Sequence, residues 1–542
     1  MINLQQKKYI GVFGLVGILL SVLFFSGVFT SQNSMPTDAI HRGNSIEPES
    51  LDPQIIKSLA EANISRDIFE GLTAEASNGV IIPGVAEKWE TSKDQTKWTF
   101  FIRKNAKWSN GESITANDFV YSFRRALDPK TAAAYSFLLR PILNADKIIK
   151  GEEKDISKLG ITAINDHTLE VQLEHPIQYL LRLLANHVAY PIHQKTIEAH
   201  KNKWTRPENI VCNGPYVPTE WVPQSHIKIS LNENYWDKAQ VKVKTIFYYP
   251  TEDRHAELKR FIAGEIHTTE SIPQDQIEWI EKNMTGSFRN TPFPGIVFYG
   301  FNMTIEPFKS NHKLRQALAL AIDRNLIADK IIKLSANPAK SWIPDGMETY
   351  QPQGFYTKTS QEEREKKAIE LYKEAGFSET TPLKVEILFN TNDAAKNLSI
   401  AIASMWKKVL GVEVALRSEE WKVFVSSRAE KKFQIIRLSG VADFPIASAF
   451  LEVFLSGTGT GNSSGYENPE FDRLVKAGIS ALSIDEQNKL FGEAEKILLN
   501  DLPIIPLYHS TTRHLVNPSI QGWMDNFMDV HPSRYLYFSE KK

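Results

Sequence analysis

The sequence contains a single cysteine, Cys212. One thiol can form no intrachain disulfide and cannot build a thiolate metal site, so we expect Cys212 to be a small buried hydrophobic side chain. The thirteen histidines are scattered, without an H-E-x-x-H or similarly dense spacing. The sequence therefore predicts no cofactor and no dedicated metal site, which leaves only a site assembled from distant segments.

The chain also lacks an excess of charge of either sign. Sixty-three Lys and Arg side chains stand against 64 Asp and Glu, for a net charge of −1. Binding to a phosphate backbone needs a basic face, so we expect no nucleic-acid partner. The 42% hydrophobic and 23% charged residues are typical of a folded soluble protein, and 542 residues indicate about three domains or two large lobes.

Signatures of enzymes are missing or out of context. No Walker A sequence is present, and Gly79–Gly84 lacks the lysine and hydroxyl that phosphate binding needs. Gly461–Gly465 matches G-x-S-x-G, which would make Ser463 a nucleophile. A nucleophile elbow directly follows an apolar strand, whereas residues 456–461 are rich in glycine. We interpret the segment as a loop and expect a protein that is not an enzyme, with a peptidase as the less favoured alternative.

The first 34 residues predict an export signal. Lys7 and Lys8 precede an uncharged run from Tyr9 to Phe29. The run is longer than a usual signal core and has no Ala-x-Ala site, so an uncleaved membrane anchor is the alternative. No cysteine follows it, which excludes a lipid anchor on a cysteine. In both cases we expect the remaining chain to work outside the cytoplasm, in the periplasm.

Downstream patterns indicate an α/β protein. Leu383–Phe389 alternates as a strand, residues 394–410 form a helical pattern ended by Gly411, and Val412–Leu416 predicts a second strand. Such a βαβ unit implies a parallel pair of strands. Another helix is expected at 419–429, before a short strand at Phe433–Ile436.

Three further patterns lie in the first quarter of the chain. Trp98–Arg103 predicts a strand, and Thr115–Asp118 resembles a capping box that opens a helix ended at Asp128. A helix is also expected across residues 62–71, stopped by Gly71.

The candidate ligand site begins at Arg437, which follows the strand predicted at Phe433–Ile436. Six residues later Asp443 precedes Phe444 and Pro445, and Gly440 lies between the two charges. The pattern predicts a short turn at the carboxyl end of a strand, where α/β sheets usually bind ligands. A cation and an anion there could meet both ends of a zwitterion. Alternatively, Arg437 pairs with an internal carboxylate and Asp443 caps a turn.

Short motifs spread over more than 400 residues resemble the peptide-binding solute-binding proteins of ABC transporters, in particular the oligopeptide-binding and murein-tripeptide-binding types. The motifs are Trp89, Phe100-x-Ile-Arg103, Trp108-x-Asn-Gly111, Thr115-Ala-x-Asp118, Asn213-Gly-Pro-Tyr216, Asn234-Tyr-Trp236, Leu314-Arg-Gln-Ala317, Ile322-Asp-Arg324, Glu374-Ala-Gly-Phe377 and Asn468-Pro-x-Phe-Asp472. Each motif is weak alone, whereas their order along nearly the whole exported chain is specific.

The resemblance implies a bilobed periplasmic-binding-protein fold of the α/β class with an extra domain and a ligand cleft between two lobes. Lobe I would comprise residues 35–70, 195–294 and 511–542. The extra domain would be 71–194, and lobe II 295–510. The implied partners are an oligopeptide ligand and an inner-membrane ABC permease, and we expect a monomer. Sister proteins for dipeptides, nickel complexes or sugars are the alternatives.

The resemblance also implies a set of site residues. Asp443 would hold the peptide α-ammonium group, and Arg437 would line the cleft and meet a ligand carboxylate. The other positions are backbone groups of the turn, aromatic side chains of the cleft, and a glutamate that matches the murein-peptide type: Ser439, Gly440, Val441, Ala442, Trp421, Tyr135, Phe298 in place of a Tyr, and Glu270.

Four positions depart from the general oligopeptide type. Lys57 stands where that type has an acidic cleft residue, and Ala395 stands in place of a His that meets peptide carboxylates. Gly295 and Val441 occupy the positions of its disulfide. A lysine favours an anionic ligand group, although it could also be a solvated surface residue. Acidic or murein-derived peptides are therefore the hypothesised ligands.

Overall fold

The computed structural model describes residues 38–333, 336–354, 359–458 and 461–539. The predicted export segment, residues 1–34, lies outside these ranges. Among the described residues, no helix combines the length and apolarity needed to span a bilayer.

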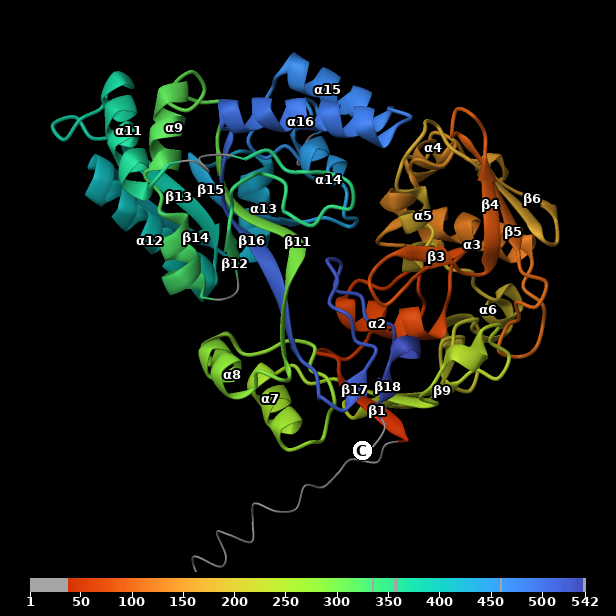
Figure 1. Ribbon diagram of the computed structural model, residues 1–542. Helices are drawn as coiled ribbons and strands as arrows, with labels where there is room; N and C mark the ends of the chain where they lie inside the picture. Colours follow the sequence, from red (N-terminus) through yellow and green to blue (C-terminus); the bar gives the residue numbers. More distant parts are fainter. Residues whose placement is uncertain (1–37, 334–335, 355–358, 459–460, 540–542) are drawn as a thin grey trace, which may run out of the picture.

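Two bodies face each other in Figure 1, and one of them has two parts. Its lower part is built on a four-stranded sheet of order β1-β10-β9-β8. The elements of this part are β1 (Ala39–Gly43), α2 (Leu59–Ile68), α6 (Gln194–His200), β8 (Tyr216–Val222), β9 (His226–Leu231), β10 (Thr245–Tyr249), α7 (Arg254–Ile262), α8 (Ile277–Asn283), β17 (Ile520–Gln521) and β18 (Tyr537–Phe538).

The upper part of the same body has its own four-stranded sheet, β4-β5-β7-β6, covered by α3. It consists of β2 (Thr73–Glu75), β3 (Ile81–Pro83), β4 (Ala86–Thr91), β5 (Lys97–Ile102), α3 (Ala116–Leu127), α4 (Ala145–Ile149), β6 (Ile161–Asn165), β7 (Thr168–Gln172) and α5 (Leu180–Leu183). All of its elements fall in the contiguous segment predicted as the extra domain.

The second body is organised around a six-stranded mixed sheet of order β12-β16-β11-β15-β13-β14. Its elements are β11 (Phe288–Phe301), α9 (His312–Leu320), α10 (Arg324–Leu326), β12 (Ala336–Pro338), α11 (Gln361–Glu374), β13 (Lys384–Asn390), α12 (Asp393–Leu410), β14 (Glu413–Glu419), α13 (Trp421–Ala429), β15 (Ile435–Val441), α14 (Ser448–Leu451), α15 (Pro469–Ile479), α16 (Ile484–Asp501) and β16 (Ile504–Leu515).

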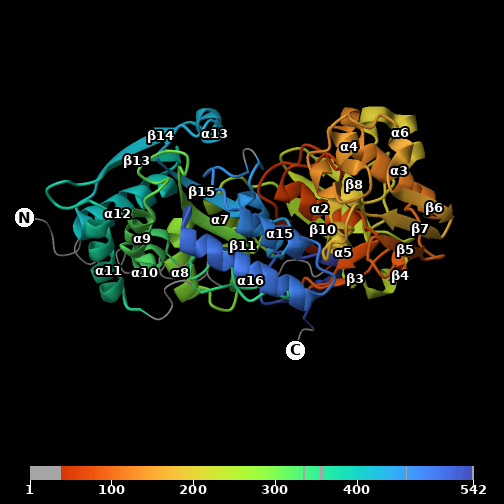
Figure 2. The ribbon, with the colours of Figure 1, turned by 90° about the horizontal axis from the view of Figure 1, so that it is seen from above.

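Two long antiparallel strands connect the bodies. β11 and β16 pair from Phe288 opposite Leu515 to Gly300 opposite Ile504, with register shifts between Pro292 and Ile296 and again at Val297. Their outer ends reach the lower part of the first body, and their inner ends form the middle of the six-stranded sheet (Figures 1 and 2). The domain boundaries predicted at 294/295 and 510/511 fall within these strands.

Several predicted elements are confirmed. β13, α12 and β14 form the expected βαβ unit, with Lys384 opposite Glu413 in a parallel pair. Thr115 and Asp118 form the capping box of α3. Gly461–Gly465 contains no strand or helix, as expected of a loop.

The helix predicted up to Gly71 is placed wrongly. α2 begins at Leu59, where Ser58 and Glu61 form a capping box, and it ends at Ile68 because Phe69 is extended. Gly71 has a different role. A Cβ atom there would lie 2.2 Å from the carbonyl oxygen of Leu184, so glycine permits close approach of two backbones.

The predicted turn after Arg437 is also wrong, because β15 continues through Val441. Along that stretch β15 pairs with β11, from Phe301 opposite Ile435 to Gly295 opposite Val441. We expected the segment around Gly440 to bend, but pairing with β11 keeps it extended.

The register of β11 and β15 gives a direct test of the pairing. Gly295 and Val441 are opposite one another, and opposed residues in antiparallel strands lie about 4.5–5.5 Å apart at Cα, within the range of a disulfide. We expect the double variant G295C/V441C to form this bond and to gain up to about 5 kcal/mol in unfolding free energy, less any strain. Thiol titration and urea unfolding with and without reductant measure both effects.

The single variants serve as controls and should show no effect of reductant. A double variant that keeps two additional free thiols under oxidising conditions would contradict the register.

Candidate functional site

One edge of β15 is free over most of its length. On one side β11 pairs with the whole strand, whereas on the other side β13 pairs only with Ile435 and Ile436. Among the described residues no strand occupies that side from Arg437 to Val441. A Cβ atom added at Gly440 would meet no atom within 4 Å, so the face of the strand is also open at this position. Such an edge presents backbone donors and acceptors to an extended chain.

A cavity of about 300 Å³ lies at the end of this edge, between the two bodies. Its walls come from five regions: α2 and the residues before it, the extra domain, the crossing strand β11, the segment that follows β15, and the loop between β17 and β18. Lining residues used below are Lys57, Tyr135, His187, Phe293, Asp443, Met528 and Val530. The site is therefore assembled from segments far apart in the sequence.

Asp443 has an unusual environment for a carboxylate. Its side chain is exposed to solvent where the cleft is open. Among the described residues, no group forms an ion pair or a hydrogen bond with it, and partial removal from water raises its pKa. Closing of the cleft would remove more of its hydration, and a cation in the cavity would offset that cost. An ammonium group is the simplest such cation.

Apart from Lys57, the other charged groups that line this cavity are paired with protein groups. Arg182 lies between Glu75 and Glu348, and Arg66 lies 3.9 Å from Glu75. The contact from Arg182 to Glu348 joins the extra domain to the second body. Lys57 is exposed, and the structure gives its ammonium group no ion-pair partner among the described residues.

Two aromatic rings shape the wall opposite Asp443. Tyr135 packs edge-to-face on His187, with ring centroids 5.0 Å apart. Burial lowers the pKa of His187 to about 4, so its ring is neutral at physiological pH, and its Nδ1 lies 2.7 Å from the Pro53 carbonyl oxygen. Burial and the charge of Asp443 raise the pKa of Tyr135. This wall is uncharged, so Asp443 determines which charge a ligand group meets at this end of the cavity.

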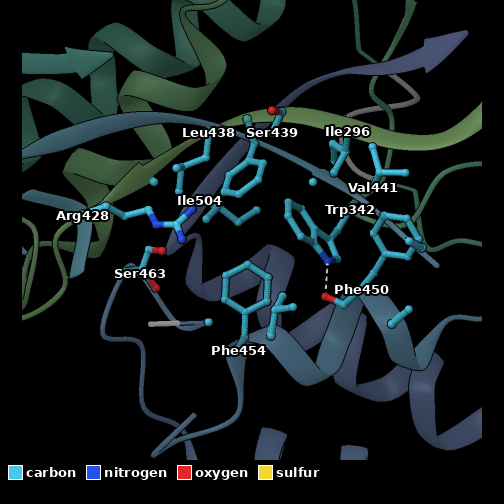
Figure 3. A pocket seen from close by; sticks show the side chains of 18 residues that line it. Ile296, Trp342, Arg428, Leu438, Ser439, Val441, Phe450, Phe454, Ser463 and Ile504 are labelled. Atoms are coloured by element: carbon cyan, nitrogen blue, oxygen red, sulfur yellow. Dashed lines mark hydrogen bonds between the residues drawn. The ribbon is translucent and has the colours of Figure 1, made fainter. Parts of the chain in front are cut away.

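A second cavity of about 190 Å³ opens beside the same stretch of β15 and shares Val441 and Ala442 with the first. Its walls are mainly apolar, and Phe298, Trp342, Phe450 and Phe454 surround it (Figure 3). Phe298 meets Trp342 edge-to-face at 4.9 Å.

Arg428 supplies the cation of this second cavity. It projects from α13 toward Ser463 at one end of the space (Figure 3). Its Nε atom is buried and has no hydrogen-bond partner among the described residues. The arrangement suits a side chain with an apolar stem and an anionic tip.

A buried carboxylate positions Trp342 from behind. Glu495 of α16 accepts hydrogen bonds from the backbone N–H groups of Trp342 and Ile343, at 3.1 and 2.9 Å. It also accepts from the backbone N–H of Gln353 and from the hydroxyl of Tyr350. Four donors converge on one carboxyl group, so Glu495 fixes the loop that forms one wall of the cavity.

Arg437 does not line either cavity. It lies opposite Tyr299 in the β11–β15 register, on the face of the sheet that packs against α12. There its guanidinium acts on the hydroxyl groups of Tyr299 and Tyr508, opposing the rise in their pKa that burial causes. Strand alternation turns Leu438 and Gly440 to the cavity face instead.

The remaining predicted residues divide in the same way. The structure brings together Asp443, Tyr135 and Lys57 in the first cavity, and Phe298, Ser439 and Gly440 at the second. Trp421 is 56% exposed and stacks on Phe424, and Glu270 lies near Glu257 in the lower part of the first body. Neither lines the two cavities. Ala395 is fully buried at the start of α12.

Sequence reasoning missed Arg428, Trp342 and Glu495. Arg428 follows a serine pair in a helix of mixed polarity, and nothing in that pattern separates it from a solvated arginine. Trp342 lies in a loop, where an aromatic residue fills a core or lines a cleft with equal ease. Only Glu495 could have been found from the sequence. It lies on the apolar side of a helical repeat, and a carboxylate in that position needs buried hydrogen-bond donors.

An open strand edge, an unpaired acid and walls contributed by two bodies define a solute-binding protein with its ligand cleft between lobes. Comparison with known proteins agrees. The family model of bacterial extracellular solute-binding proteins, family 5, matches residues 80–462. The chain belongs to this family.

Relatives align over nearly the whole chain. The periplasmic murein peptide-binding protein MppA of Escherichia coli is 37% identical over 495 residues, 91% of each chain. The periplasmic oligopeptide-binding protein OppA of Salmonella typhimurium is 38% identical over 488 residues, 89% of each chain. These relatives are binding proteins of the periplasm.

Solved structures of relatives superpose on the chain to different degrees. The unliganded open form of MppA superposes with a TM-score of 0.85 at 36% identity, covering 93% of this chain and 98% of that one. Haemophilus influenzae OppA in complex with the peptide RPPGFSPFR gives 0.73 at 33% identity, covering 93% and 99%. The unliganded open form is thus the more similar of these two structures.

The support that Glu495 gives to Trp342 predicts a pH dependence. Burial raises the pKa of Glu495 to about 7, above its ordinary value of 4.5. A carboxyl that holds its proton more tightly when folded contributes stability that is fully present below the unfolded pKa and is lost as the pH rises toward the folded value. Relative to E495Q, the unmodified protein should therefore lose stability between pH 4.5 and 7.

Urea unfolding from pH 4.5 to 8 measures this difference. The exposed neighbour on the same helix provides the control E493Q, which should run parallel to the unmodified protein. If the unfolding free energies of E495Q and of the unmodified protein vary with pH in parallel, the pKa of Glu495 does not change on folding.

Proposed function

We propose that this protein captures extended peptides in its interlobe cleft and delivers them to an ABC importer. The observation that carries the proposal is Asp443, a carboxylate without a protein partner that lies in the cleft at the end of a free strand edge. A peptide meets both features at once, because its α-ammonium group pairs with Asp443 while its backbone pairs with Arg437–Val441. The names of the relatives, which bind oligopeptides or murein peptide, support the same reading.

Capture involves no chemical step. A peptide that contacts both lobes stabilises the closed state by its differential affinity for that state, and a membrane permease would read the closure. We propose the division into lobe I, extra domain and lobe II given by the sequence, with β11 and β16 as the hinge. We also propose a periplasmic monomer that acts without a nucleic-acid partner.

Peptide selectivity would come from the second cavity. A side chain that enters past Leu438 and Gly440 meets aromatic walls and then Arg428. Together with Lys57 in the first cavity, this arginine favours a ligand with additional carboxylates, such as an acidic or murein-derived peptide.

Asp443 supplies the first test. D443A should weaken binding of a free peptide by roughly 30-fold, because loss of a buried charge pair costs about 2 kcal/mol or more. The same variant should bind the N-acetylated peptide as the unmodified protein does. Calorimetry with both peptides measures the difference.

Asp146 provides a matched control, since it lines a neighbouring cavity that also includes Asp443 but pairs with Lys150 at 2.6 Å. D146N should bind both peptides normally. An equal loss of both peptides in D443A would make Asp443 a structural residue.

Arg428 and Arg437 form a second pair for comparison, because they lie on opposite faces of the six-stranded sheet. R428Q should lose about tenfold in affinity for a peptide with an acidic side chain and keep its affinity for a neutral one. R437Q tests the carboxylate role expected from the sequence, with circular dichroism as the check on folding.

If R437Q loses affinity for the acidic peptide and not for the neutral one, while R428Q binds both normally, then Arg437 and not Arg428 holds the anionic side chain. Native mass spectrometry of the purified protein would identify a retained ligand, and incubation with peptides would separate retention from cleavage by a peptidase.

A further inference from the structure

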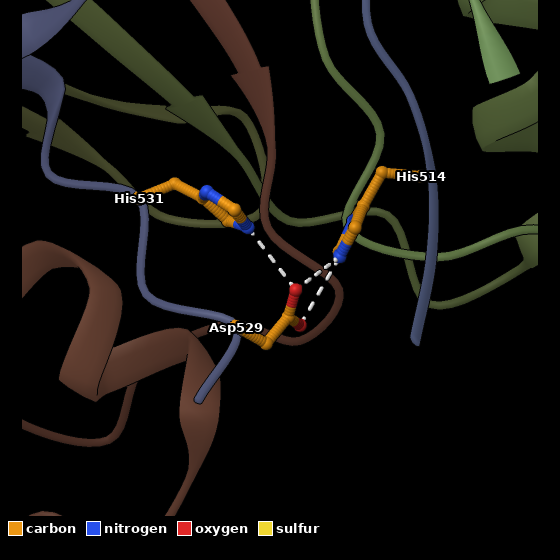
Figure 4. Close-up of side chains that lie close together, drawn as sticks. All are labelled: His514, Asp529 and His531. Atoms are coloured by element: carbon orange, nitrogen blue, oxygen red, sulfur yellow. Dashed lines mark hydrogen bonds and ion pairs between the residues drawn. The ribbon is translucent and has the colours of Figure 1, made fainter. Parts of the chain in front are cut away.

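Two histidines and an aspartate from distant segments converge beside the crossing strands (Figure 4). His514 belongs to β16, whereas Asp529 and His531 belong to the loop between β17 and β18. His514 Nε2 lies 2.8 and 3.1 Å from the two carboxylate oxygens of Asp529, and His531 Nε2 lies 3.1 Å from Oδ1. The ligand atoms of all three lie within 4.8 Å of one another.

The hydrogen bond behind His514 fixes which nitrogen faces the aspartate. His514 Nδ1 lies 3.1 Å from the carbonyl oxygen of Thr269, which can only accept, so Nδ1 carries the hydrogen. Nε2 is then the nitrogen that faces Asp529. A metal ion bound there would take the place of the proton that joins the two groups in the ion pair.

The three ligand atoms are close enough to surround one ion once the side chains rearrange. Ligand atoms about 2.1 Å from a tetrahedral ion are about 3.4 Å apart. Here the contacts to Asp529 Oδ1 are 2.8 and 3.1 Å, and no pair of ligand atoms is more than 4.8 Å apart. The backbone carbonyl behind His514 is the usual outer partner of a metal-binding histidine. Two imidazoles and one carboxylate are a donor set for zinc and neighbouring divalent transition metals.

The surroundings hold the ligands in place and leave access from outside. Trp523 stacks on the His531 ring at 3.7 Å and meets His514 edge-to-face. The side chain of Asp529 is 17% exposed, which gives an ion and its water a path. Glu257 and Glu270 act on His514 with negative charge, while Arg42 opposes a cation at His531.

The cluster is coupled to the ligand cleft through two residues of the loop. Met528 and Val530 flank Asp529 and line the first cavity, facing the segment that contains Asp443. An ion held by His514, Asp529 and His531 would tie this wall of the cleft to β16, the strand that crosses between the lobes.

We propose that His514, Asp529 and His531 form a site for one divalent transition-metal ion of the zinc type, which fixes the C-terminal loop against β16. The site is separate from the peptide site and requires no peptide. The ion contributes structure, and solvent completes its coordination.

Zinc binding to the chelator-treated, untagged protein tests the proposal. Calorimetry should give one zinc per chain, and zinc should raise the melting temperature. With Co²⁺ as the probe, visible absorption should show a low-symmetry site with nitrogen ligands. H531Q, which keeps a donor toward Asp529, should lose at least about tenfold in zinc affinity together with the thermal shift.

A surface pair gives the matched control, because His255 Nε2 lies 3.0 Å from exposed Asp275. H255Q should retain full binding. D529N provides a second variant at the site. No zinc binding by the unmodified protein, or binding that H255Q abolishes and H531Q and D529N leave intact, would overturn the proposal.

Discussion

The pairing of β11 with β16 is the constraint on which the rest of this structure depends. The two strands belong to both bodies, so any movement of one lobe relative to the other must bend them or alter their register shifts near Pro292 and Val297. Gly295 shows how closely the two strands pack at this point, because a Cβ atom there would lie 2.9 Å from Ser510 Oγ. The pair also places β15 beside β11, and hence sets where the free edge opens.

Around that edge, charge is distributed unevenly. Most buried ions have obvious partners: Glu70, for example, accepts from Tyr235, Trp236 and Arg534. Asp443 differs because it lies in the cleft, exposed to solvent, and has no partner among the described residues. An unpaired acid in a cleft lowers the stability of the fold slightly. Such acids therefore mark positions where a ligand supplies the missing partner.

Much of the second lobe could be predicted from the sequence, because its βαβ unit has clear periodicity and its helices have distinct ends at Gly411 and Asn468. The two crossing strands could not. Pro292, Pro294 and Pro506 interrupt the pattern, and strands tolerate them here only through irregular pairing, which depends on the partner strand.

The candidate site shows the same division. Asp443 was evident from its position after a strand, yet Arg437 and Arg428 cannot be told apart without knowing which face of a sheet or helix each occupies. Likewise, the His514, Asp529 and His531 cluster spans segments whose proximity depends on the long-range course of the chain.

The order in which the elements are completed follows from where the partners lie along the chain. The extra domain is one continuous segment and can fold as soon as it emerges from a ribosome or a membrane channel. The six-stranded sheet lacks its second crossing strand until residue 515 has emerged. β1 pairs with β10, but its Arg42 also needs the C-terminal segment, where it donates to Ser533 and to the carbonyl of His531. Both lobes therefore remain unfinished until almost the last residues appear, whereas the extra domain is complete long before.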